Sequence, residues 1–154
     1  LIGSTGTLRT LQLLQHTFVP PDFHPKSMSI EEYMTRLFVD ALRTTLKDSG
    51  ASYKDKDKES HDNETLVGLR GRLFVVSSDY AIRESIDTYC AIGNGEELAL
   101  GSLFSTEKMR MSPHQRLELA LQAASYHCNS VRAPYHFQEL AMTLEEVQEE
   151  FASV

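Results

Sequence analysis

Residues 88–103 have the sequence TYCAIGNGEELALGSL, which predicts a strand, a glycine turn and a helix in direct succession. Residues 88–92 are β-branched, aromatic or small and suit a buried strand. Gly93 and Gly95 tolerate positive φ angles and permit close approach of another backbone. Glu96 and Glu97 then place carboxylates at the positive end of a helix dipole. Such a unit can build a binding site or serve packing alone, and the fold does not decide between the two.

This turn does not match a phosphate-binding loop. Leu98 stands where a dinucleotide-binding fingerprint requires its third glycine, and the first helical turn carries two carboxylates that would repel a phosphate. The chain contains no Gly-Lys-Ser/Thr sequence, which excludes a P-loop.

The composition is that of an ordinary globular domain. The 154 residues are 41% hydrophobic and 24% charged, enough for one domain with a substantial core. The net charge of −7 argues against a nucleic-acid binder, which requires a basic surface. No apolar run reaches membrane length and no signal-peptide pattern opens the chain, so we expect a cytoplasmic protein. Cys90 and Cys128 are then expected to be free thiols.

Two helices are predicted before the centre of the chain. Residues 8–16 have helical spacing of leucines, and Pro20 and Pro21 follow them. Ser29 and Glu32 form a capping-box pattern, from which a second helix runs to about residue 48. The apolar stripe predicted for this second helix consists of Met34, Leu37, Phe38 and Ala41.

A charged segment separates these helices from the predicted strands. Residues 51–63 alternate lysines with acidic residues and have no apolar anchor, which predicts a mobile loop. Residues 64–69 and 72–77 flank Arg70-Gly71 and predict a hairpin. A short strand is expected within residues 80–87.

The last third of the chain is predicted to be mainly helical. Ser112-Pro113 is typical of a cap followed by the first helical residue, and apolar residues recur at helical spacing up to Cys128. Residues 135–140 predict a short strand or a loop, and Thr143 with Glu146 predicts a final capped helix. Consecutive helices followed by consecutive strands indicate an α+β fold with an antiparallel sheet covered by helices. Because the strands are few and Leu1-Ile2-Gly3 reads as a strand end, we expect further strands upstream.

Two parts of the sequence together resemble the proteasome β-subunit family, with the bacterial HslV peptidase as the most similar type. They are the strand end with Gly3-Ser4-Thr5-Gly6 before a helix, and the later segment 91–99, AIGNGEELA. Residues 62–76 are similar to the central hairpin of that family, and residues 112–130 to the second helix of its last pair. The resemblance covers residues 1 to about 140.

The resemblance implies an N-terminal-nucleophile hydrolase with a four-layer αββα sandwich. Members cut peptide bonds with a threonine at the mature N-terminus, whose α-amino group acts as the base and is tuned by a lysine from an early strand. Both positions correspond to residues before Leu1, so the N-terminal strands and the catalytic threonine are expected upstream of residues 1–154. The implied function is that of a subunit of a ring-shaped, self-compartmentalised peptidase.

The resemblance also implies roles for individual residues. Gly3 matches the glycine whose backbone N–H helps to form the oxyanion hole. Leu1, Gly3 and Thr5 match positions that line the substrate side-chain pocket and pair with the peptide. Asn94 stands where the family has a serine that assists the threonine amine, although an amide relays protons poorly. Tyr126 stands where an aspartate is usual, a second departure from the family pattern.

A cation site is the one cofactor that the resemblance suggests. Ser125, Cys128 and Val131 match a loop whose carbonyls hold a monovalent cation such as Na⁺ in relatives. The residues themselves indicate no other metal, because the six histidines and two cysteines lack zinc-site spacing. The acidic residues at 55, 57 and 59 alternate with lysines and lack an EF-hand glycine.

Three functions remain open from the sequence. The chain can be part of a threonine peptidase, with peptide or unfolded-protein substrates, a homo-oligomeric ring and an ATPase unfoldase as partner. It can be a non-catalytic structural subunit of such a ring. It can also be an unrelated α+β interaction module, in which case Gly3 is a turn residue and Asn94 an ordinary turn residue. Nucleic acid and membrane partners are not expected.

Overall fold

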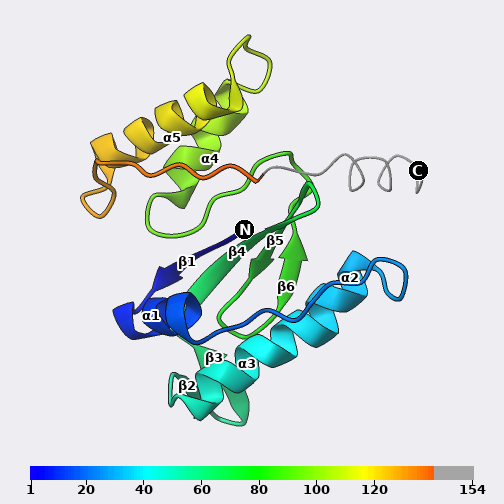
Figure 1. The fold of residues 1–154 in the computed structure, drawn as a ribbon. Helices are drawn as coiled ribbons and strands as arrows, with labels where there is room; N and C mark the ends of the chain where they lie inside the picture. Colours follow the sequence, from blue (N-terminus) through cyan, green and yellow to red (C-terminus); the bar gives the residue numbers. More distant parts are fainter. Residues whose placement is uncertain (141–154) are drawn as a thin grey trace. The chain divides into compact units, whose positions relative to one another are not determined.

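The computed structural model describes residues 1–140, except for the side chain of residue 55. The predicted helix after Thr143 lies outside this described part. The described residues form two compact units, which we treat separately (Figure 1). One unit consists mainly of Ile2–Val67 and Phe74–Glu84, and is called the sheet unit below. The other contains Gly68–Leu73 and the residues from Ser85 onward, and is called the helical-pair unit.

A four-stranded sheet has the order β1-β4-β5-β6. Its strands are β1 (Ile2–Gly6), β4 (Asn63–Leu69), β5 (Arg72–Val76) and β6 (Ile82–Glu84). β1 pairs antiparallel with β4, and β5 pairs antiparallel with β6. Arg70 and Gly71 have φ angles of 47° and 76°, the backbone of a two-residue hairpin turn. The predicted hairpin and the short strand in residues 80–87 are therefore confirmed.

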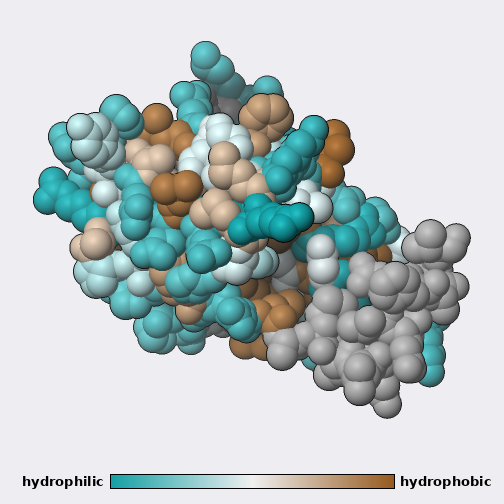
Figure 2. Space-filling view, turned by 90° about the horizontal axis from the view of Figure 1, so that it is seen from above, coloured by the Kyte–Doolittle hydropathy of each residue, from teal (hydrophilic) through white to brown (hydrophobic). Residues whose placement is uncertain are grey.

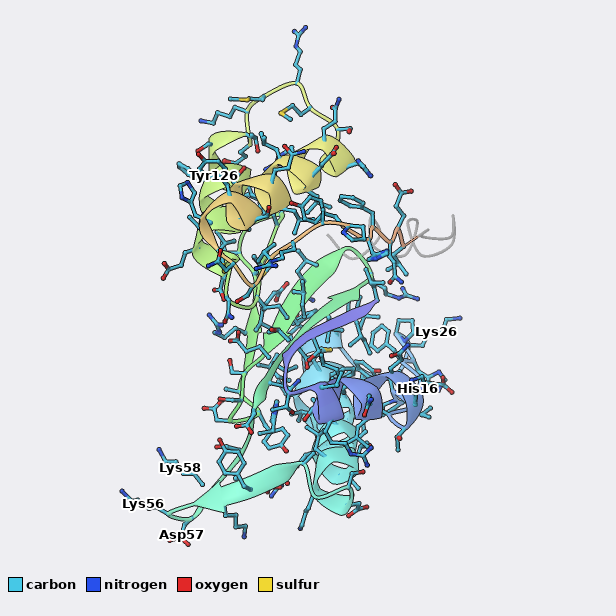
Figure 3. The ribbon with its side chains drawn as sticks, turned by 90° about the vertical axis from the view of Figure 1, so that its left-hand side faces the viewer. His16, Lys26, Lys56, Asp57, Lys58 and Tyr126 are labelled. Carbon is cyan, nitrogen blue, oxygen red and sulfur yellow. The ribbon has the colours of Figure 1, made fainter. Side chains whose placement is uncertain are left out.

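Helices α1 (Leu8–His16), α2 (Ile30–Glu32) and α3 (Val39–Asp48) belong to the sheet unit, and α1 and α3 lie on one side of the sheet (Figures 1 and 3). α1 begins and ends at the predicted residues, and the second predicted helix, from Ser29 to about residue 48, covers α2 and α3. The Ser29 side chain accepts a hydrogen bond from the Glu32 backbone N–H, as expected for a cap. Phe18 and Phe38 meet edge to face, with ring centroids 5.4 Å apart. The core of this unit is built by the buried residues Leu13, Phe18, Tyr33, Met34, Phe38, Leu42, Leu46, Val67, Phe74, Val75 and Val76.

The second predicted helix contains a π-helical segment, η1 (Tyr33–Phe38), between α2 and α3. A wider turn shifts the phase of the side chains that follow it. Tyr33 and Phe38, at the two ends of this segment, are both buried together with Met34, whereas Leu37 remains 38% exposed. The predicted stripe was correct for Met34 and Phe38 and wrong for Leu37.

The charged segment at residues 51–63 forms a hairpin rather than the irregular loop that its composition predicted. Strands β2 (Ser52–Asp55) and β3 (Lys58–His61) pair antiparallel. Lys56 and Asp57 form the turn with positive φ angles of 46° and 72°, and with Lys58 they mark its outer end in Figure 3. Cross-strand pairing and attachments to α3 supply the anchor that the segment lacks in apolar residues. Its mobility remains a prediction.

The helical-pair unit contains α4 (Glu96–Ser105) and α5 (Pro113–His127), which pack side by side (Figure 1). Ser112 and Gln115 form a reciprocal capping box, and Pro113 is the first helical residue, as predicted. The core of the pair is made of small residues and one leucine: Ala99, Leu103, Ala120 and Ala124. Leu98 and Leu117, apolar residues of these two helices, are 36% and 44% exposed.

The strand predicted at residues 88–92 is not present in the described structure. This segment is irregular and has no ladder partner among residues 1–140, and its half-buried Tyr89 and Ala91 pack against α4 and α5. Residues 135–140 likewise contain no strand and form a loop. No helix of the described residues is long and apolar enough to cross a membrane.

Candidate functional site

Strand β1 lies at one edge of the sheet formed by the described residues. The Leu1 amino group donates to the Gly68 carbonyl at 2.9 Å, and the Gly68 N–H donates to the Leu1 carbonyl at 2.8 Å. Hydrogen-bonded and non-hydrogen-bonded pairs alternate along an antiparallel ladder. In the observed register, the next hydrogen-bonded pairs are therefore Gly3 with Leu66 and Thr5 with Glu64.

This alternation assigns opposite roles to neighbouring residues of β1. The backbone N–H and C=O groups of Leu1, Gly3 and Thr5 face β4, where they take part in the ladder. The backbone groups of Ile2, Ser4 and Gly6 face the opposite, edge side. A strand edge that is unpaired among residues 1–140 can accept an extended peptide as an additional strand.

The side chains of Leu1, Gly3 and Thr5 share one face of the strand, because strand side chains alternate. Leu1 is 50% exposed, Gly3 is exposed and Thr5 is half-buried. A Cβ added to Gly3 would meet no atom within 4 Å, so the backbone at Gly3 does not require glycine.

Gly6, by contrast, is a position that only glycine fits. Its φ angle is +134°, and an added Cβ would lie 2.2 Å from the Asp62 carbonyl oxygen and 2.6 Å from the Asn63 Cγ. Gly6 ends β1 immediately before Thr7, the N-terminal cap of α1. The sequence resemblance assigned the oxyanion-hole glycine to Gly3. The steric restriction at Gly6 comes from Asp62 and Asn63, about 57 positions later in the chain, so it has no local sequence signal.

A buried polar cluster underlies this end of β1. The Ser4 hydroxyl donates to the Glu64 carbonyl at 2.7 Å and lies 3.1 Å from the Thr65 hydroxyl. The Asn63 amide donates to the Ser4 Oγ at 3.4 Å, and Asn63 and Thr65 are almost fully buried. Polar side chains buried in this way stabilise a unique strand position.

The second predicted region is the turn before α4 in the helical-pair unit. Gly93 has a φ angle of 95°, and Gly95 is the cap that precedes Glu96. A Cβ at Gly95 would lie 2.8 Å from a Val131 methyl and 3.0 Å from the Ala124 Cβ. Another segment therefore does approach this glycine turn closely, but the approaching atoms belong to the side chains of Ala124 in α5 and Val131 after it.

Asn94 connects this turn to the segment after α5. Its side-chain Nδ2 donates to the Ser130 Oγ at 3.2 Å, and its backbone carbonyl accepts a weak hydrogen bond from the Cys128 Sγ at 3.6 Å. Asn94 is exposed. Ser130 was not among the residues predicted from the sequence, because a contact over 36 positions has no local signal.

An open cavity of about 750 Å³ adjoins Asn94 and is lined by Gly93, Asn94, Glu96, Glu97, Leu98 and His127. Its wall carries two carboxylates, an amide and an imidazole. No group of three or more His, Cys, Asp or Glu side chains in residues 1–140 is arranged to hold a metal ion.

The predicted cation-loop residues lie at the end of α5. Ser125 is in its last turn, Cys128 is its C-cap and Val131 follows, with the Val131 N–H donating to the Cys128 carbonyl at 3.1 Å. The Cys128 carbonyl therefore has one partner, and a carbonyl oxygen has a second lone pair. Tyr126, at the expected aspartate position, is 85% exposed and projects from α5 (Figure 3).

Gly3, Thr5 and Asn94 thus fall in two different units. Gly3 and Thr5 lie on β1 in the sheet unit, whereas Asn94, Ser125, Cys128 and Val131 lie in the helical-pair unit. Within the latter, the structure brings Asn94, Cys128 and Ser130 into contact.

Comparison with known proteins identifies the fold. No protein-family model and no curated protein matches the chain. Among solved structures, Thiobacillus denitrificans BPH superposes with a TM-score of 0.68 at 20% identity, over 86% of this chain and 70% of BPH. A structure of BPH in complex with epoxomicin gives a TM-score of 0.67 at 21% identity, with the same coverage. The chain therefore shares the α+β fold of BPH.

Proposed function

We propose that this chain belongs to a proteasome-like threonine peptidase of the HslV type, with the nucleophile upstream of Leu1. The observation that carries the proposal is the fold shared with BPH over 86% of the chain, because one BPH structure contains epoxomicin. The sequence resemblance to proteasome β-subunits supports it independently. The finer architecture, a four-layer αββα sandwich completed by upstream strands, is part of the same proposal.

The substrate in this proposal is an extended peptide that pairs with the edge of β1. The edge-facing backbone groups of Ile2, Ser4 and Gly6 would form the ladder, while Leu1, Gly3 and Thr5 would contribute the neighbouring side-chain surface. The oxyanion donor suggested for Gly3 fits Gly6 better. The Gly3 N–H is directed to Leu66, whereas the Gly6 N–H faces the edge at a site where a side chain is excluded.

Asn94 would act as the residue that assists the threonine amine. Its Nδ2 contact with Ser130 supports this role, since it holds the amide in one orientation. An amide supplies a hydrogen bond but relays a proton poorly, so we expect slow turnover.

The loop after α5 would hold a monovalent cation through the carbonyls of Ser125, Cys128 and Val131. The Ser125 carbonyl lies in the last helical turn, where carbonyls lack intrahelical partners. Such a cation would fix the Cys128–Ser130 segment and, through it, Asn94. Ring assembly and an ATPase unfoldase remain part of the proposal by family likeness.

A non-catalytic ring subunit is the second candidate function. The observation that favours it is Tyr126, which is 85% exposed at the position of the expected aspartate and contributes no carboxylate. Asn94 in place of serine points the same way.

The test compares the whole protein with residues 1–154 alone, using a fluorogenic peptide and epoxomicin. Catalysis requires a threonine hydroxyl beside a free α-amine. Residues 1–154 alone should therefore neither hydrolyse the fluorogenic peptide nor be labelled by epoxomicin. The whole protein should begin with threonine after processing and bind epoxomicin. Labelling of residues 1–154 would refute the nucleophile assignment, and a whole protein without labelling or turnover would favour the structural subunit.

Asn94→Ser in the active whole protein tests the assisting residue. We expect kcat to rise about tenfold with little change in KM, because serine can relay the proton. Ser102→Ala in α4, which leaves the turn unchanged, is the control. An unchanged kcat in Asn94→Ser would remove Asn94 from the mechanism.

A further inference from the structure

His61, at the end of β3, is an ionisable side chain that is almost fully buried. It is only 1% exposed, and neither ring nitrogen meets hydrogen-bond geometry with a described residue. Its ring lies against the Tyr80 ring, with centroids 4.6 Å apart. Buried polar groups usually have partners, so an imidazole without one requires an explanation.

Both rings belong to the attachment of the β2–β3 hairpin. The His61 backbone N–H donates to the Ser78 carbonyl at 2.9 Å, which joins β3 to the turn between β5 and β6. Tyr80 lies in that turn with a φ angle of 65°, an unusual backbone for a bulky residue, and its hydroxyl is buried without a partner. The Ser77 N–H donates to the Ala81 carbonyl at 2.8 Å and closes the turn.

A second attachment joins the hairpin to α3. The Arg43 Nε donates to the Glu59 carboxylate at 2.7 Å, and the same carboxylate forms an ion pair with Nη2. This pair lies beside an open cavity of about 450 Å³, whose lining includes Arg43, Glu59 and Tyr80. The hairpin is thus attached by the Arg43–Glu59 ion pair, the His61–Tyr80 ring contact and the backbone hydrogen bond from His61 to Ser78.

We propose that His61 and Tyr80 form an acid-sensitive latch, which holds the β2–β3 hairpin closed at neutral pH and releases it when His61 is protonated. Protonation would place a positive charge on a ring that is only 1% exposed, and burial disfavours the charged form. Release of the hairpin exposes His61 to water, where the proton is accepted. Protonation and opening are therefore one coupled event.

The charges around His61 define when the latch opens. Burial lowers the pKa of His61, although a backbone group of Ser77 and the carboxylates of Asp62 and Asp79 favour the charged form. The closed state therefore binds fewer protons than the open state, whose histidine has an ordinary pKa of about 6.5. Stability of the closed state is complete above about pH 6.5 and falls as the pH decreases below that value.

Glu59 and Tyr80 keep their charge states over the same range. Arg43 holds the pKa of Glu59 below its usual value of 4.5, so the ion pair persists in weak acid. Burial raises the pKa of Tyr80, so its hydroxyl stays neutral. His61 is therefore the group whose protonation opens the hairpin as the pH falls below about 6.5.

Amide hydrogen exchange across the hairpin, corrected for the intrinsic pH dependence, tests the latch in the whole protein. In the wild type, the amide exchange rates of the paired residues Ser52 and His61 should increase by up to about tenfold for each pH unit below pH 6.5. In His61→Phe, the same amides should exchange slowly both at neutral pH and below pH 6.5. His24→Gln, an exposed histidine in the same unit, is the matched control and should behave as wild type.

Two further measurements separate the latch from general instability. Glu59→Gln removes the ion pair and should increase exchange at neutral pH while keeping the acid-dependent rise. A titration of the His61 imidazole by nuclear magnetic resonance requires no variant and so decides the matter even if His61→Phe does not fold. Protonation of His61 at pH 6.5 or above, with the hairpin still protected, would overturn the proposal, as would equal acid dependence in wild type and His61→Phe.

Discussion

Gly3 and Gly6 lie on the same strand, and their surroundings show how two identical residues acquire different importance. Gly3 has an ordinary strand conformation and open space where a side chain would be. Gly6 has a φ angle of +134° and lies against the Asp62 carbonyl and the Asn63 side chain. Only the second position therefore depends on the absence of a Cβ atom.

The first prediction follows from this difference. Gly6→Ala should lower the free energy of unfolding by about 2–4 kcal/mol, because the new methyl group meets backbone and the φ angle is unfavourable. Gly3→Ala is the control and should change the free energy of unfolding by less than about 1 kcal/mol. Urea denaturation of both variants measures the difference. Equal stabilities would show that the end of β1 relaxes freely.

At the scale of elements, the helical pair is stabilised by one arginine as well as by its small core. The Arg116 Nη2 donates to the Leu103 carbonyl at 2.7 Å and Nε donates to the Thr106 hydroxyl at 3.3 Å. The guanidinium also lies 5.4 Å from the centroid of the Tyr89 ring. Arg116 thus joins α5 to the C-terminal end of α4, where carbonyls need partners and the dipole favours a cation.

Arg116→Ala should lower the free energy of unfolding by about 1–3 kcal/mol, since a charge-assisted hydrogen bond and an aromatic contact are lost together. Arg116→Lys should recover only part of this, because lysine lacks the planar fork. Arg36→Ala, which removes an exposed ion pair with Glu32 in the sheet unit, should cost less than about 0.5 kcal/mol. If both alanine variants melt alike, Arg116 does not hold the pair together.

The β2–β3 hairpin gives the second prediction at this scale. Residues 51–63 were predicted to be mobile, and we now expect that mobility to decrease from the outer turn toward the base of the hairpin. Lys56 and Asp57 should exchange their amides freely at neutral pH, whereas His61, whose N–H donates to the Ser78 carbonyl, should be protected. Uniformly fast exchange through residues 52–61 would instead support a fully mobile segment.

For the whole molecule, the exposed strand edge and the exposed apolar side chains bear on association. β1 is an edge strand among residues 1–140, and Phe104 and Leu117 are 71% and 44% exposed. On the face drawn in Figure 2, hydrophobic side chains lie between hydrophilic ones. Open edges and apolar patches favour pairing with another chain.

Residues 1–154 alone should therefore self-associate in a concentration-dependent way and bind a dye that reports apolar surface. Size-exclusion chromatography with light scattering measures the first property, and dye fluorescence the second. Gly3→Lys, at a position of the edge strand where an added Cβ meets no atom within 4 Å, should weaken association if β1 is the contact. A monomer with a sharp cooperative melt and no dye binding would contradict the expectation of an incomplete sandwich.

Local chemistry in the sequence determined the helices and one hairpin. The capping residues Ser29 and Ser112 and the turn at Arg70-Gly71 were each predicted correctly, because a cap or a two-residue turn depends on atoms within about four residues. The α+β class followed from the order of these elements.

Only the tertiary structure decided the features that depend on distant partners. Residues 88–92 have strand composition yet pack against α4 and α5, while the charged residues 52–61 form strands because Arg43 and Ser78 hold them. The need for glycine at Gly6 is set by Asp62 and Asn63, and the contact of Asn94 with Ser130 spans 36 positions. Such features arise from contacts between residues far apart in the sequence, which compete with local propensity, and a single sequence carries no local signal for them.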